Sequence, residues 1–106
     1  MKKYKLTLSE TDISTLQRMI EHIISIEPMP PLEDQLLFCG LQEVLAVLKR
    51  KQLEWRKQYK ITLSPMQAIS LRVMFNDYIA PNRDYTNAAY VALLKINNDI
   101  HQKYYV

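Results

Sequence analysis

A chain of 106 residues suffices for one compact domain, whereas two separate halves of about 50 residues would each be only marginally stable. Its 48% hydrophobic and 24% charged residues are typical of a globular protein and exclude a disordered one, and a single glycine disfavours a turn-rich β-sandwich or barrel. The net charge of +3 is too mild to indicate nucleic-acid binding by itself, although nine of the fourteen Lys and Arg residues lie within 1–5 and 49–60. The composition therefore predicts a single helical domain, residues 1–106.

The sequence predicts neither a membrane span nor a disulfide. No run approaches the roughly eighteen apolar residues of a transmembrane helix, and Ser9, Glu10 and Asp12 interrupt the short apolar segment that precedes them. The one cysteine, Cys39, has no intramolecular partner, and its apolar neighbours favour a buried thiol. We therefore expect a cytoplasmic protein without membrane contact.

One six-residue stretch occurs twice. Residues 4–9 (YKLTLS) and 59–64 (YKITLS) are 55 positions apart and agree at five of six positions. Apolar positions downstream match at the same offset. This self-similarity indicates an internal duplication, with repeat 1 over 4–55 and repeat 2 over 59–105.

Each repeat is predicted to begin with a strand that leads directly into a helix. Residues 4–8 alternate between apolar and polar side chains, as in a half-buried strand, and the copy at 59–63 is the obvious antiparallel partner. Ser9 and Ser64 stand where a helix N-cap is expected, each with a capping-box partner three residues later. The apolar stripe that follows predicts a first helix over 10–26.

A second helix is predicted after the prolines that end the first one. Its inward stripe contains Leu41, Val44 and Leu48, and the spacing carries Trp55 into the core as well. Between 36 and 48 this helix is apolar around most of its circumference. This predicts either that the helix is central in the domain or that another subunit covers it. We therefore expect a homodimer or another protein partner. The residues predicted for this interaction surface are Leu36, Gly40, Val47, Tyr104 and Tyr105.

The second repeat is predicted to have the same order of elements. A helix is predicted over about 65–79, because Pro81 prevents it from continuing. Asp84 or Thr86 is expected to cap a last helix. The predicted fold class is mainly α: a four-helix domain built from two tandem strand-helix-helix repeats with a short two-stranded antiparallel ribbon. Equivalent core positions are expected for Leu16 and Leu71, Leu41 and Leu93, and Val44 and Ile96.

No group of residues in the sequence specifies a reaction. The chain has no Glu-x-x-His, no His-Glu-x-x-His and no second cysteine, and one glycine cannot build a phosphate-binding loop. His22 and His101 have no neighbouring ligand pattern, which predicts surface or boundary positions, and Ser9 and Ser64 are accounted for by capping. We therefore expect no enzyme, no metal and no cofactor.

The basic segment 49–60 allows two interpretations. Its cations could contact nucleic-acid phosphates or an acidic protein, with Trp55 and Tyr59 as stacking surfaces. Alternatively, Lys and Arg gather at the end of the second helix because they complement the negative end of its dipole. The second interpretation is favoured, since Trp55 is expected in the core.

The strand-helix-helix order resembles the ribbon-helix-helix family of DNA-binding proteins, in which an antiparallel ribbon from two such units lies in the major groove. The chain departs from the family in its proline-rich segment 27–34, where Glu33 and Asp34 would repel a phosphate. By exclusion, the sequence favours a small non-enzymatic binding or assembly module. The alternative is a tandem ribbon-helix-helix-like DNA-binding protein. The nucleic-acid contacts that the resemblance implies are Lys5, Thr7, Lys60 and Thr62.

Overall fold

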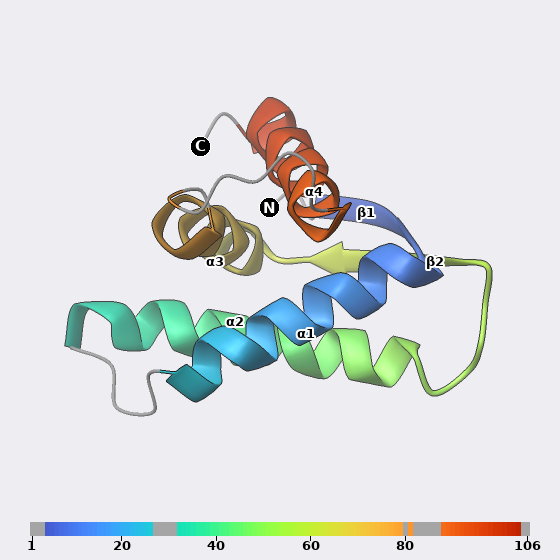
Figure 1. Cartoon of the computed structure of the whole chain (residues 1–106), viewed down its shortest axis with the longest axis horizontal. Coiled ribbons are helices and arrows are strands. Elements are labelled where there is room, and N and C mark those ends of the chain that lie inside the picture. The colour runs from blue at the N-terminus through green and yellow to red at the C-terminus, as the bar shows by residue number, and fades with distance from the viewer. Residues whose placement is uncertain (1–3, 27–31, 80, 82–87, 105–106) are drawn as a thin grey trace.

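The computed structural model describes residues 4–26, 32–79, 81 and 88–104. In Figure 1, α1 crosses α2, the two strands run side by side, and α3 and α4 pack on the remaining side of the molecule. The prediction of a mainly helical domain with a two-stranded antiparallel ribbon is confirmed. The elements in chain order are β1 (Tyr4–Ser9), α1 (Glu10–Ile26), α2 (Leu32–Lys51), β2 (Gln58–Leu63), α3 (Pro65–Met74), the π-helical turn η1 (Phe75–Ile79) and α4 (Ala88–Tyr104).

The register of the ribbon relates the two repeated stretches symmetrically. β1 and β2 pair antiparallel, and Leu6 lies opposite Ile61, which is its equivalent at the repeat offset of 55 (61 − 6 = 55). An approximate twofold axis through this central pair would produce the same register. The pairs that flank the centre are Lys5 with Thr62 and Thr7 with Lys60.

The inward face of the ribbon is part of the hydrophobic core. Burial alternates along both strands, because successive side chains point to opposite faces. Burying each large apolar side chain stabilises the fold by roughly 1.5–3 kcal/mol, which fixes the strand register. The inward side chains are Tyr4, Leu6, Leu8, Tyr59, Ile61 and Leu63, all at most 4% exposed. The predicted core pairs are likewise buried: Leu16 and Leu71, Leu41 and Leu93, and Val44 and Ile96.

Serine side chains cap the two helices that follow the strands, as predicted. Ser64 Oγ accepts a hydrogen bond from the Gln67 backbone N–H (3.2 Å), and Gln67 Oε1 accepts one from the Ser64 N–H (2.9 Å). Ser9 Oγ accepts from the Asp12 backbone N–H at 3.1 Å. Each cap stabilises its helix by about 1 kcal/mol, because amides in the first turn have no partner within the helix.

Two predictions for α2 are wrong. The helix ends at Lys51, so its periodicity cannot carry Trp55 into the core, and that side chain is 64% exposed. Cys39 is an exposed free thiol. With 3.6 residues per turn, Cys39 lies on the side of α2 opposite the buried stripe, and apolar neighbours in sequence do not surround it in space.

α2 and α3 approach each other closely at Gly40. A Cβ atom added at Gly40 would lie 2.9 Å from the Ser70 Cβ, and closer still to its hydroxyl oxygen. Ser70 is buried at 5% exposed, and its hydroxyl donates to the Met66 carbonyl at 2.9 Å. A contact within the chain therefore accounts for the single glycine.

Candidate nucleic-acid interface

The outward face of the ribbon carries the four side chains that the resemblance implies as DNA contacts. Lys5 and Thr7 of β1 are exposed, and so are Lys60 and Thr62 of β2. The register sets each lysine opposite a threonine, so the two lysines lie diagonally across the ribbon. Their exposure means that no described helix covers this face.

A two-stranded ribbon is narrow enough to enter the major groove of B-DNA. Neighbouring strands lie about 4.8 Å apart, and the B-DNA major groove, about 12 Å wide, admits a two-stranded ribbon. Lys can donate hydrogen bonds to guanine O6 and N7, whereas Thr can contact the thymine methyl group or a phosphate. Ser9 and Gln58 form a further exposed pair that extends this polar face by one step.

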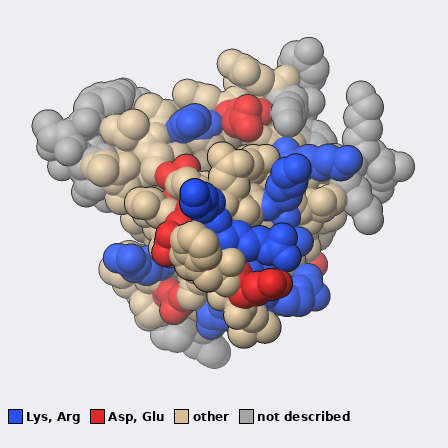
Figure 2. Space-filling model, turned by 90° about the vertical axis from the view of Figure 1, so that its right-hand side faces the viewer, with Lys and Arg blue, Asp and Glu red and all other residues tan. Residues whose placement is uncertain are grey.

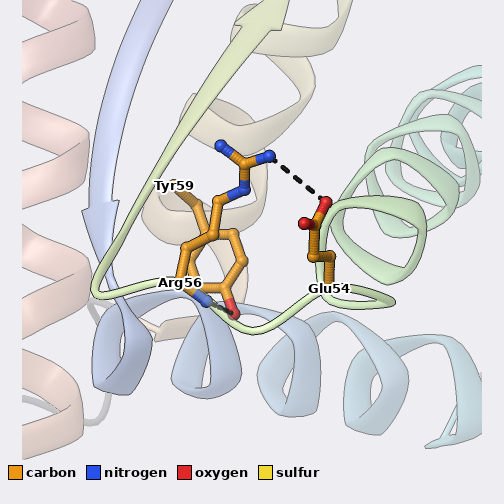
Figure 3. A network of polar contacts seen from close by, with 3 residues as sticks. All are labelled: Glu54, Arg56 and Tyr59. Atoms are coloured by element: carbon orange, nitrogen blue, oxygen red, sulfur yellow. Dashed lines mark hydrogen bonds and ion pairs between the residues drawn. The ribbon is translucent and has the colours of Figure 1, made fainter.

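A buried tyrosine holds the start of each strand in place. The Tyr4 hydroxyl donates to Asp99 Oδ2 of α4 at 2.9 Å. The Tyr59 hydroxyl accepts a hydrogen bond from the Arg56 backbone N–H at 3.1 Å, as Figure 3 shows. Because Tyr59 is only 3% exposed, it cannot be the stacking surface that the basic segment suggested. Both tyrosines instead hold the backbone that presents the outward side chains.

A basic hollow of about 510 Å³ lies where α2 connects to β2. Four cations and one carboxylate line it, and the carboxylate, Glu54 Oε2, lies 3.2 Å from Arg56 Nη2 (Figure 3). Figure 2 shows Lys and Arg side chains gathered on this side of the molecule, with a few acidic side chains between them. The hollow is lined by Arg50, Lys51, Leu53, Glu54, Arg56, Gln58, Tyr59 and Lys60.

Of the residues predicted for an interaction surface, Leu36, Gly40 and Val47 are described, and they differ in exposure. Leu36 is 63% exposed, Gly40 is buried against Ser70, and Val47 is half-buried against the core. The side chain of Tyr104 and the whole of Tyr105 lie outside the described residues.

An apolar groove of about 360 Å³ between α2 and α3 was not predicted as such. Leu36 lies at this groove, beside the exposed side chains of Met66 and Ile69 from α3. At the repeat offset of 55, the latter two correspond to Thr11 and Ser14 of α1, which are polar. These two apolar side chains of the groove therefore have polar counterparts at that offset. Its lining residues are Asp34, Leu36, Leu37, Met66, Ile69, Ser70 and Val73.

The polar groups away from the ribbon stabilise helix packing. Arg72 of α3 donates to Asn97 Oδ1 of α4 at 3.0 Å and lies 3.2 Å from His101 Nδ1. His22 and His101 are exposed, as predicted for surface or boundary histidines. Among the described residues, no three His, Cys, Asp or Glu side chains gather as a metal site would require. In the same part of the chain, no helix is both long enough and apolar enough to cross a membrane.

Comparison of the chain with protein-family models, with curated proteins and with solved structures gives no match. The resemblance to the ribbon-helix-helix family therefore stays a prediction from the order of elements.

Proposed function

We propose that the protein binds duplex DNA and that the outward face of the ribbon enters the major groove. The observation that carries this proposal is the exposure of Lys5, Thr7, Lys60 and Thr62 on one face of the ribbon, which no described helix covers. An assembly module would allow that face to be covered, whereas a DNA reader requires it to be open.

The repeated stretch itself supports this proposal. Its copies differ only at Leu6 and Ile61, and both of these side chains are buried beneath the ribbon. The outward residues are the same in both copies, although the solvated face of a strand is where substitution costs least stability. With the symmetric register, identical outward residues would present the same groups to both halves of an approximately palindromic site.

The first test is titration of the protein into a labelled random duplex at low salt. We expect binding that weakens steeply as salt is added, because protein cations release counterions condensed on the phosphates. The double variant Lys5→Ala/Lys60→Ala should bind more weakly. A matched control, Arg18→Ala/Lys95→Ala, removes the same charge from exposed positions on α1 and α4 and should change binding less. Duplex RNA should bind poorly, since its major groove is too deep and narrow for the ribbon.

Two results would remove the proposal. One is no binding by the parent protein at low salt. The other is undiminished binding by the Lys5→Ala/Lys60→Ala variant, which would show that the ribbon does not meet the duplex.

A second candidate function is assembly through the apolar groove between α2 and α3. Leu36, Met66 and Ile69 are exposed there at 63%, 49% and 44%, respectively. The occupant we propose is a second copy of the chain, because an isologous contact would cover the same apolar side chains on both copies. Light scattering at tens of micromolar should then show a dimer, and Leu36→Lys/Ile69→Lys should give a monomer. A monomeric parent protein would exclude this candidate.

A further inference from the structure

We propose that the basic hollow binds backbone phosphates of the duplex whose major groove the ribbon enters. This inference rests on the proposed function and extends it, since the hollow lies beside the face that would read the bases. It also assigns a role to the cations that follow α2.

The helix dipole accounts for only part of the charge in the hollow. Arg50 and Lys51 belong to the last turn of α2, where cations complement the negative end of the helix. Arg56 and Lys60 lie beyond that turn, and the dipole effect falls off within one turn of the helix end. The dipole therefore does not explain why Arg56 and Lys60 join the other two cations in the hollow. The lining holds one carboxylate, that of Glu54.

The hollow is continuous with the outward face of the ribbon. Gln58 and Lys60 line the hollow, and both are outward residues of β2. A two-stranded ribbon occupies much of a groove about 12 Å wide, so elements that stand beside the ribbon meet the sugar-phosphate backbone. The hollow lies beside the ribbon because only residues 52–57 separate the end of α2 from the start of β2.

Hydrogen bonds hold the segment that forms the hollow. The Gln52 N–H donates to the Leu48 carbonyl at 3.1 Å, and the Leu53 N–H donates to the Arg50 carbonyl at 3.3 Å. Further along, the buried Tyr59 hydroxyl accepts from the Arg56 N–H. The last of these bonds holds the backbone at Arg56, so ligand binding there orders less of the chain and carries a smaller cost in backbone conformational entropy.

Glu54 is expected to weaken phosphate binding in the hollow. Its ion pair with Arg56 is exposed, with 63% of the Arg56 and 78% of the Glu54 side chain accessible, and such pairs are weak. A phosphate oxygen can replace the carboxylate as the partner of Arg56, because a guanidinium binds either group with two parallel hydrogen bonds. Glu54 therefore opposes phosphate binding, both by occupying Arg56 and by its own charge.

The experiment compares salt dependence among matched variants. We expect Arg50→Ala/Arg56→Ala to lower the slope of log K against log salt by about 0.9 for each phosphate that the variant no longer neutralises, or about eightfold in affinity per phosphate at 0.1 M salt. The Arg18→Ala/Lys95→Ala control should lower the slope much less. Glu54→Gln should act in the opposite direction and tighten binding by roughly two- to fivefold, the range that an exposed ion pair supports. A gain in affinity cannot result from misfolding.

The outcomes separate this inference from the proposed function. If Lys5→Ala weakens binding but the hollow variants and Glu54→Gln leave it unchanged, the hollow is not a phosphate site and the ribbon proposal stands. If the hollow variants weaken binding while Lys5→Ala has no effect, the ribbon proposal fails, and the hollow binds phosphates of a duplex that the ribbon does not enter. If the parent protein binds vesicles containing phosphatidylserine but not duplex DNA, both proposals are overturned.

Discussion

Replacing Gly40 by alanine tests the close contact between α2 and α3. The added Cβ would lie 2.9 Å from the Ser70 Cβ, and each of these atoms is attached directly to a helix backbone. Neither can yield without a shift of its helix, so the upper half of the roughly 1–3 kcal/mol cost of overpacking applies. Alanine also gains about 1 kcal/mol of helix propensity. The net expectation is a decrease of roughly 1–2 kcal/mol in the free energy of unfolding.

Thermal and urea denaturation can measure this decrease, which corresponds to a fall in Tm of roughly 5–15 °C. Ser70→Gly should rescue Gly40→Ala, because it removes both atoms that the new methyl group would meet. Ser70→Ala is the matched comparison and should rescue only in part, because it removes the hydroxyl oxygen but keeps the Cβ. A Gly40→Ala variant as stable as the parent, or more stable, would refute the close approach. A double-mutant cycle without coupling between these positions would refute it as well.

Three further predictions concern single side chains. Ser64→Ala removes the capping box of α3 and should lower the free energy of unfolding by about 1 kcal/mol, measured by urea denaturation. Tyr4→Phe should cost about 1 kcal/mol in the same assay, because it removes the hydroxyl that donates to Asp99 at 2.9 Å, and Asp99→Asn in the Tyr4→Phe background should add little. Cys39 should react with a maleimide in the native protein at a rate near that of a free thiol; protection until unfolding would contradict its exposed position.

The sequence predicted the parts of the fold that depend on short-range pattern. Period-two alternation around Leu6 and Ile61 predicted both strands, and the strand pairing followed from the repeat. Capping at Ser9 and Ser64 is equally local, because a hydroxyl and an amide three residues later are brought together by the helix itself. Long, strongly periodic helical segments such as 10–26 are predicted well for the same reason.

The errors arose where an element ended or where tertiary packing decided exposure. Helical spacing placed Trp55 in the core, but α2 ends four residues earlier, at Lys51. Cys39 has apolar neighbours in sequence, yet only one side of α2 faces the core. The π-helical turn at 75–79 has no recognised signal in the sequence. The expected cap at Asp84 or Thr86 lies outside the described residues.

The candidate interface was predicted in part. Lys5 and Lys60 followed from strand alternation, because the face of a short strand can be read from the sequence. The basic hollow could not be predicted, because it requires that the chain after α2 turn back beside β2 and bring Arg50 and Arg56 together. The close approach at Gly40 did carry a signal, since an isolated glycine in a helix indicates a packing reason.

The most direct test of the DNA-binding proposal is a titration of isotopically labelled protein with a short B-form duplex, followed by amide chemical shifts. We expect the largest changes at Lys5, Thr7, Lys60 and Thr62, with further changes in the connection between α2 and β2. The apolar groove between α2 and α3 should change little, because it is separate from the ribbon face. Changes confined to that groove, or no change at the four strand residues under conditions of saturated binding, would contradict the proposal that the ribbon enters the major groove.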